Sequence, residues 1–261
     1  MAKLMGVVNV TPDSFSDGGL FLDPEAAIAH GRELAAAGAE VLDVGGESTR
    51  PGAEAVSEDE ELRRVIPVIQ GLVATEARIS VDTSKAAVAA AALDAGAEIV
   101  NDVTALRGDR AMAALCAERG AIVVLMHMRG EPRTMQDDPR YEDVVAEVKA
   151  FLAERLEEAT GAGIAEDRVW LDPGIGFGKT AAHNMELLRR LGELRDLGRP
   201  LVIGTSRKSF IGKVDGSAAG DRLGGTIASS VLAAAEGAAV LRVHDVAEVR
   251  QALAVATAIL G

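Results

Sequence analysis

The sequence predicts a single-domain α/β fold, a (β/α)8 TIM barrel that extends over residues 1–261. One observation behind this prediction is a repeated order: an alanine-rich helical stretch, a glycine break, and a short apolar run that ends in polar residues. The other is the count, because eight such runs divide the chain into units of nearly equal length. A doubly wound open sheet is the alternative, but the even spacing and the eighth run favour the barrel. No linker, charge block or low-complexity stretch marks a second domain.

The predicted strands lie near residues 4–9, 40–44, 78–82, 98–101, 121–126, 168–171, 200–204 and 239–242. The repeat is clearest in "AAAGAEVLDVGGES" (35–48), "LDAGAEIVNDV" (93–103) and "AAEGAAVLRVHD" (234–245). In each stretch the glycine stands where a helix C-cap is expected. The Val, Ile and Leu residues that follow are typical of a strand buried on both faces, as in a parallel sheet.

Helical patterns fill the gaps between the strands. Asp23 predicts an N-cap, with Pro24 in the first turn of the helix that follows. Ser57 and Glu60 have the spacing of a capping box at the start of the next helix. Pro67 predicts a kink in that helix, because proline lacks an N–H and its ring clashes with the preceding turn.

Composition and charge exclude several functional classes. The net charge of -13 argues against non-specific binding to nucleic acid, which needs a basic surface. Cys116 is the single cysteine, so we expect it to be a small buried apolar residue and expect no disulfide framework. Apolar runs such as "AIVVLM" are too short to span a bilayer, and "MAKLMGVVNVTPDSF" turns polar too early for a signal peptide. We therefore expect a cytoplasmic protein without a membrane or nucleic-acid partner.

Polar side chains follow the apolar runs, at the carboxyl ends of the predicted strands, where TIM barrels carry their active sites. Any single Asp or Asn there could instead cap a helix or a turn, but caps rarely need Lys, Arg and His. The cations gather at one rim of an acidic protein, which implies an anionic ligand such as a phosphate or diphosphate. The carboxylates and the amide suit a heterocycle with a guanidine-like N–H edge. The residues are Asn9, Asp43, Asp82, Asn101, His127, Asp172, Arg50, Arg207, Lys208, Arg242 and His244.

The stretch "DPGIGFGKT" (172–180) invites comparison with an ATP-binding phosphate loop. A Walker A loop needs a glycine at position 173, and that residue is proline. The glycines at 174, 176 and 178 do not match G-x-G-x-x-G either. The stretch therefore predicts a strand that delivers Asp172 to the pocket, followed by a turn that carries Phe177.

Eight segments occur in order between Met5 and about Val246: "MGVVNVTPDSFSDGG", "DVGGESTRPGA", "SVDTSK", "NDV", "LMHMRGEPRTMQ", "DPGIGFGK", "GTSRKSFIG" and "RVHDV". In this order they resemble the motifs of the bacterial dihydropteroate synthase family. The resemblance implies a pterin-binding TIM barrel, a homodimer, and a transferase of folate biosynthesis. Its substrates would be 6-hydroxymethyl-7,8-dihydropterin diphosphate and p-aminobenzoate, with Mg²⁺ as cofactor and sulfonamides as inhibitors.

The resemblance also implies a role for individual residues. Asn101, Asp172 and Lys208 would hydrogen-bond the pterin, and Asp82 would lie deeper, near the developing positive charge. Met126, Phe177 and the apolar part of Arg242 would flank the ring. Asn9 would hold the Mg²⁺–diphosphate, aided by Arg50, Arg242 and His244. The residues implied around p-aminobenzoate are Phe15, Asp17, Thr49, Arg50 and Pro51 on mobile loops, with Gly204, Ser206 and Lys208 at its carboxylate end.

The implied chemistry needs electrostatic placement rather than a protein nucleophile, because diphosphate leaves once its charge is neutralised. In agreement, the sequence contains no Gly-x-Ser-x-Gly elbow. The catalytic set implied is Asp82, Lys208, Arg242 and Asn9, with Asn9 also the metal ligand. Two alternatives are a pterin-binding methyltransferase barrel, which would have little use for the diphosphate set, and a non-catalytic pterin-binding paralogue, which would be expected to lose Arg50, Lys208 or Arg242.

Four polar residues near strand ends are left outside the predicted site. Lys85 is expected to be a surface lysine at a helix start, and Lys179 and Thr180 to open the helix after their turn. His127 ends a strand, so a structural role and ligand contact both stay open.

Overall fold

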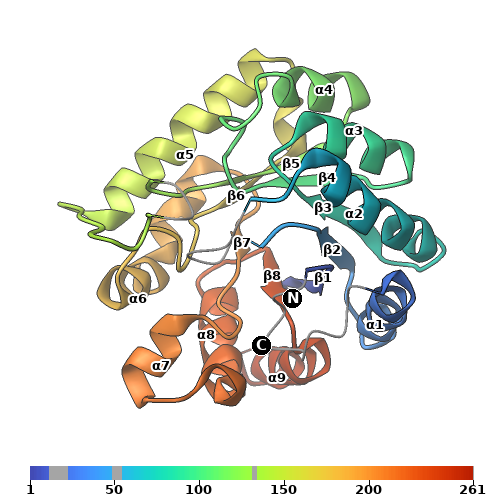
Figure 1. The fold of residues 1–261 in the computed structure, drawn as a ribbon. Helices are drawn as coiled ribbons and strands as arrows, with labels where there is room; N and C mark the ends of the chain where they lie inside the picture. Colours follow the sequence, from blue (N-terminus) through green and yellow to red (C-terminus); the bar gives the residue numbers. More distant parts are fainter. Residues whose placement is uncertain (12–22, 49–54, 131–133, 261) are drawn as a thin grey trace.

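A computed structural model describes residues 1–11, 23–48, 55–130 and 134–260. Within these residues, eight parallel strands form one sheet in the order β6-β5-β4-β3-β2-β1-β8-β7. A parallel bridge between Leu171 and Leu201 connects the two ends of this order and brings the sheet round into a barrel. The predicted (β/α)8 fold is confirmed, and Figure 1 shows the helices on the outside of the strands.

The strands begin and end close to the predicted positions. They are β1 (Lys3–Asn9), β2 (Val41–Gly45), β3 (Arg78–Asp82), β4 (Ile99–Asp102), β5 (Ile122–Met126), β6 (Val169–Asp172), β7 (Val202–Ile203) and β8 (Val240–Val243). β7 is shorter than expected, because only Val202 and Ile203 pair with β8.

The α-helices are α1 (Pro24–Ala36), α2 (Glu58–Leu72), α3 (Ala86–Asp94), α4 (Met112–Arg119), α5 (Val144–Gly161), α6 (Ala181–Arg189), α7 (Ser209–Asp215), α8 (Leu223–Ala235) and α9 (Val246–Leu260). Short 3-10 helices are η2 (Glu166–Arg168), η3 (Leu191–Leu197) and η4 (Ala219–Asp221). None of the helices in the described part of the chain is long and apolar enough to cross a membrane.

The predicted helix starts are largely correct, and one detail differs. Asp23 caps α1 by accepting a bond from the amide of Glu25. Ser57 caps α2, but Glu60 does not complete the capping box, because its carboxylate binds Arg64 instead. α2 continues through Pro67 to Leu72, where Val68, Ile69 and Leu72 are fully buried against the barrel, and the kink at Pro67 stays a prediction.

A buried apolar layer fills the amino-terminal half of the barrel interior. It consists of Met5, Val41, Ile99, Ile122, Val124, Trp170, Val202 and Val240. Side chains two residues apart on a strand share a face, so the next inward positions after Val41, Ile99, Trp170 and Val240 are Asp43, Asn101, Asp172 and Arg242. The inward-facing side chains of these strands therefore change from apolar to polar between one inward position and the next.

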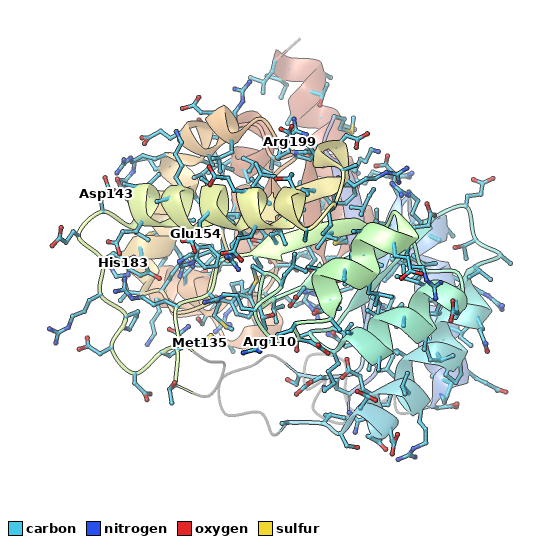
Figure 2. The ribbon with its side chains drawn as sticks, turned by 90° about the horizontal axis from the view of Figure 1, so that it is seen from above. Arg110, Met135, Asp143, Glu154, His183 and Arg199 are labelled. Atoms are coloured by element: carbon cyan, nitrogen blue, oxygen red, sulfur yellow. The ribbon has the colours of Figure 1, made fainter. Side chains whose placement is uncertain are left out.

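Figure 2 shows the two ends of the barrel from the side. Arg199, which precedes β7, lies at one end, and Met135, which follows β5, lies at the other. The polar layer lies toward the end marked by Met135, where the strands have their carboxyl termini.

Candidate active site

The strand register brings the predicted polar residues into one row. Asn9 pairs with Gly45, Gly45 with Asp82, and Asp82 with Asn101, so these four positions neighbour one another at the carboxyl ends of β1 to β4. Met126 pairs with Asp172 on the other side of the barrel. The expected convergence on one mouth is therefore present for the strand residues.

The guanidinium of Arg242 is the centre of the polar layer. Its Nε donates to Oδ2 of Asp43 at 2.6 Å, and its Nη2 donates to Oδ2 of Asp82 at 2.9 Å. Nδ2 of Asn101 donates to the same Asp43 oxygen at 3.0 Å. Asp43 is completely buried, and its Oδ1 has no hydrogen-bond partner in the described part of the chain. The sequence predicts Asp43 only as a polar residue at a strand end. Its pairing with Arg242, 199 residues away, follows only from the folded structure.

Asp82 has a strongly perturbed acidity. Its pKa is raised to about 7, chiefly by burial and also by the carboxylates of Asp43, Glu61 and Asp102, against the opposing effect of Arg242. A carboxyl group poised near neutrality in a polar cleft is typical of functional sites.

Asp172 is held rigidly at the end of β6. It is 7% exposed, and its Oδ1 accepts a bond from the amide of Gly174 at 2.6 Å. Burial raises its pKa, whereas the Gly174 amide and the charges of Lys208 and Lys179 lower it.

Lys208 and Phe177 meet across the site from different loops. Nζ of Lys208 lies 4.1 Å from the centroid of the Phe177 ring, a cation–π contact. Gly176 makes this approach possible: its φ is +87°, and a Cβ there would lie 3.0 Å from Cδ of Lys208.

An apolar wall adjoins these groups. Met126 and the partly buried Phe177, both predicted, pack with the unpredicted Val103, Met128 and Met135. Met128 could have been predicted from the motif "LMHM", because Met126 and Met128 are two residues apart and so share a face of an extended chain. Val103 and Met135 could not have been predicted in this way.

A contact between Ser206 and His244 connects the segments that follow β7 and β8. Oγ of Ser206 lies 2.9 Å from Nδ1 of His244 and accepts a bond from its backbone amide. Gly204 lies beside Arg242, and a Cβ at this glycine would be in ordinary contact with it. Arg207, expected among the rim cations, is ion-paired with Asp245 at 2.7 Å, so its charge is largely compensated.

Two lysines left outside the predicted site have different surroundings from those expected. Lys85 does begin α3, but it is not a surface lysine: its amine binds both Glu47 and the fully buried Glu61. Thr180 caps α6, as expected, whereas Lys179 lies before the cap, is 3% exposed and has its Nζ 2.8 Å from Nδ1 of His127. His127 is buried too, which supports its structural role.

Some predicted residues lie outside the described part of the chain: Phe15, Asp17, Thr49, Arg50 and Pro51. Their assignment to p-aminobenzoate and diphosphate therefore stays a prediction. In the described ranges, no group of three or more His, Cys, Asp or Glu side chains could hold a metal ion. Asn9 contributes a single amide oxygen at the end of β1.

Known proteins resemble this chain over nearly all of its length. The profile of the family described as pterin binding enzymes matches residues 5–244. Dihydropteroate synthase of Escherichia coli K12 is 48% identical over 259 residues, which cover 99% of this chain and 92% of that protein.

Two solved structures have the same fold. Yersinia pestis dihydropteroate synthase in a complex with a sulfonamide drug superposes with a TM-score of 0.96 at 44% identity, covering 99% of this chain and 94% of that one. The Xanthomonas albilineans enzyme in complex with 7,8-dihydropteroate gives a TM-score of 0.90 at 49% identity, covering 100% and 94%. The chain therefore belongs to the pterin-binding enzyme family and, within it, to the dihydropteroate synthases.

Proposed function

We propose that this protein condenses 6-hydroxymethyl-7,8-dihydropterin diphosphate with p-aminobenzoate to give 7,8-dihydropteroate and diphosphate. The observation that carries the proposal is the contact of Lys208 with Phe177 beside the buried Asp172, next to the Asp82–Arg242 pair. This arrangement offers acceptors, a cation and an apolar face to one flat, polar-edged ring. A relative of the same family is known in complex with the product.

The pterin fits the site through its edge and its faces. The carboxylate of Asp172 accepts N–H bonds from the aminopyrimidine edge, in the orientation that Gly174 fixes. Lys208 donates to the acceptors of the ring. The wall of Met126, Met128 and Phe177 covers the apolar face of the ring and excludes water from it.

The reaction exchanges one bond for another at the pterin methylene carbon. The C–O bond to diphosphate breaks, its electron pair leaves with the diphosphate, and positive charge spreads over the pterin. Ionised Asp82, whose side chain is largely removed from solvent, stabilises that charge. The nitrogen of p-aminobenzoate then forms the C–N bond and loses a proton.

The diphosphate requires cations that the described residues supply in part. The two bonds of Arg242 to carboxylates use two of the five N–H donors of its guanidinium, so it can also donate to a phosphate oxygen. Ser206 holds His244 through Nδ1 just after the end of β8, and the resemblance implies that His244 aids the binding of the diphosphate. Arg50 is the further cation that the sequence predicts for this role.

Magnesium fits this site as a substrate-bridged ion rather than as an ion in a protein cage. Mg²⁺ is commonly bound by one or two protein oxygens together with substrate phosphates, and the amide oxygen of Asn9 is such a hard donor. When bound, Mg²⁺ would neutralise charge on the leaving diphosphate. We expect turnover to require added Mg²⁺ after chelation, and the Asn9→Leu variant to need more Mg²⁺ for half-maximal rate. An equal requirement in both proteins would contradict the role of Asn9.

The activity itself can be tested in one assay. Purified protein is mixed with the pterin diphosphate, Mg²⁺ and p-aminobenzoate, and the formation of dihydropteroate and diphosphate is followed. Both products should appear in equal amounts, and only with the arylamine present. A sulfonamide should compete with p-aminobenzoate. A methyltransferase or a non-catalytic pterin-binding protein would release no arylamine-dependent diphosphate.

We further propose that two copies associate through α6, α7 and α8. These helices line an apolar groove of 520 Å³ that includes Leu188, Phe210 and Val214. Val214 and Leu232 are 67% and 65% exposed there. Arg189 and Asp215 lie on the same groove, so a second copy related by a two-fold axis can bring opposite charges together.

Light scattering tests the dimer directly. The wild-type chain should have twice the mass of one chain, and Val214→Glu should shift it toward the monomer. Val255→Glu on α9, also exposed, is the matched control and should leave the mass unchanged. A monomeric wild type would exclude this surface as a dimer interface.

The cytoplasm is the compartment we propose, in line with an acidic chain whose single cysteine is buried and free.

A further inference from the structure

The turn between β6 and α6 has little backbone pairing of its own. Gly174, Gly176 and Gly178 have φ values of +68°, +87° and +61°, a conformation that glycine reaches readily and other residues rarely adopt. No helix or strand ladder holds residues 173–179 in place. The turn nevertheless carries Phe177 and fixes Asp172, so side-chain contacts must supplement its internal backbone bond from the amide of Phe177 to the carbonyl of Gly174 at 3.1 Å.

The amine of Lys179 supplies the inner support. Nζ donates to the carbonyl oxygens of Gly174 and Phe177, each at 2.9 Å, and lies 2.8 Å from Nδ1 of His127. Burial lowers the pKa of Lys179 to about 7. In its charged form the amine has three N–H donors, so each of these acceptors then receives one. Burial, and the charge of Lys179, lower the pKa of His127 to about 2, so the imidazole is neutral and its Nδ1 can accept.

Each group that Lys179 contacts belongs to a site residue, or to a residue that is bonded to one or adjacent to one in sequence. The amide of Gly174, whose carbonyl Lys179 holds, donates to Oδ1 of Asp172 at 2.6 Å. The other carbonyl belongs to Phe177, whose ring contacts Lys208. His127 follows Met126 at the end of β5, so the same amine also connects the turn to the strand that supplies the apolar wall.

The outer side of the turn is held by different groups. Gln136 donates to the carbonyl of Gly176 at 2.7 Å, and the hydroxyl of Tyr141 donates to that of Gly178 at 2.8 Å. The amide of Gly176 donates to Asn184 on α6 at 2.8 Å. Loss of Lys179 would therefore remove one bond to the carbonyl of Gly174, which keeps its bond from the amide of Phe177, and would leave the carbonyl of Phe177 without this donor. Because the outer bonds keep the turn in place, we expect a local change rather than global unfolding.

We propose that Lys179 is a positioning residue for the pterin substrate: its buried amine joins the end of β5 to the β6–α6 turn and so sets the orientation of Asp172 and Phe177. This inference rests on the proposed function and extends it to a residue that does not itself touch the substrate. The sequence does not predict this positioning role, because Lys179 stands at the end of a stretch that does not match a nucleotide-binding motif.

The test is the variant Lys179→Met, which keeps the length of the side chain and removes all three donors. The Michaelis constant for the pterin diphosphate should rise about ten-fold, because small misplacements of binding groups are costly. The Michaelis constant for p-aminobenzoate should stay within about two-fold of the wild type. Lys3→Met, an exposed lysine at the opposite end of the barrel, is the control and should change neither constant.

A purely structural role would lower the melting temperature and leave both constants unchanged well below it, and this result would overturn the proposal. Lys179→Gln keeps donors at nearly the same reach and should show a smaller rise in the pterin constant. If neither variant folds, Lys179 serves global stability and the proposal is wrong. Absence of turnover in the wild type would instead contradict the proposed function, so the two failures are distinguishable.

Discussion

Nη2 of Arg242 donates a hydrogen bond to Oδ2 of Asp82 at 2.9 Å, across the barrel from β8 to β3. The same guanidinium binds Asp43 at 2.6 Å, so two inward-facing carboxylates share one cation. This pairing keeps an acidic residue at the bottom of the site ionisable without leaving it as an isolated buried charge. It also makes the stability and the activity of the barrel depend on the same contacts.

We expect Arg242→Met to destabilise the protein by about 3 kcal/mol, because it leaves buried carboxylates without their cation. Urea unfolding at pH 7.5 measures this loss. The double variant Asp43→Asn/Arg242→Met should recover part of it, since one of the unpaired charges is gone. Additive losses in the double variant would show that Asp43 and Arg242 are not energetically coupled.

Asp82→Asn should retain the fold and lower kcat by about 100-fold or more, because a neutral amide cannot stabilise the developing pterin cation as a carboxylate does. Steady-state kinetics, with circular dichroism as the check on folding, measure this. Asp167→Asn, at an exposed position in η2, is the control and should be indistinguishable from wild type. Turnover near the wild-type rate in Asp82→Asn would remove Asp82 from the catalytic set.

The pH dependence of stability should reveal the raised pKa of Asp82. The folded state holds this proton up to about pH 7, whereas the unfolded state releases it near the ordinary value of 3.8. Between these values the folded state binds more protons, so the contribution of Asp82 to stability falls as pH rises from about 4 to 7. Urea midpoints between pH 5 and 8 should therefore decline less in Asp82→Asn than in wild type. An identical decline in both proteins would contradict the raised pKa.

Lys208→Met should raise the Michaelis constant for the pterin diphosphate and lower kcat, by about 100-fold together in kcat/KM, because it removes a charged donor beside Asp172. The methionine can still pack on the Phe177 ring, so the melting temperature should change little. Lys3→Met is again the matched control. Equal kinetics in both variants would mean that Lys208 does not contact the pterin.

The sequence by itself determined the barrel and the mouth of the site. The repeated glycine breaks and the runs such as "VLDV" gave strands within a few residues of those observed, because a strand buried on both faces leaves a strong apolar signal. Asp82, Asn101 and Asp172 could be placed together, because strand ends in a closed parallel sheet must meet. Eight ordered motifs then identified the family.

Only the tertiary structure decided how the polar residues are paired. The contact of Arg242 with Asp43, the contact of Lys85 with Glu61, and the burial of Lys179 beside His127 all join segments that are distant in sequence. A lysine looks the same in a sequence whether it is solvated or buried among carbonyl groups. The difference arises from packing, because desolvation forces a buried cation to find partners wherever the fold places them.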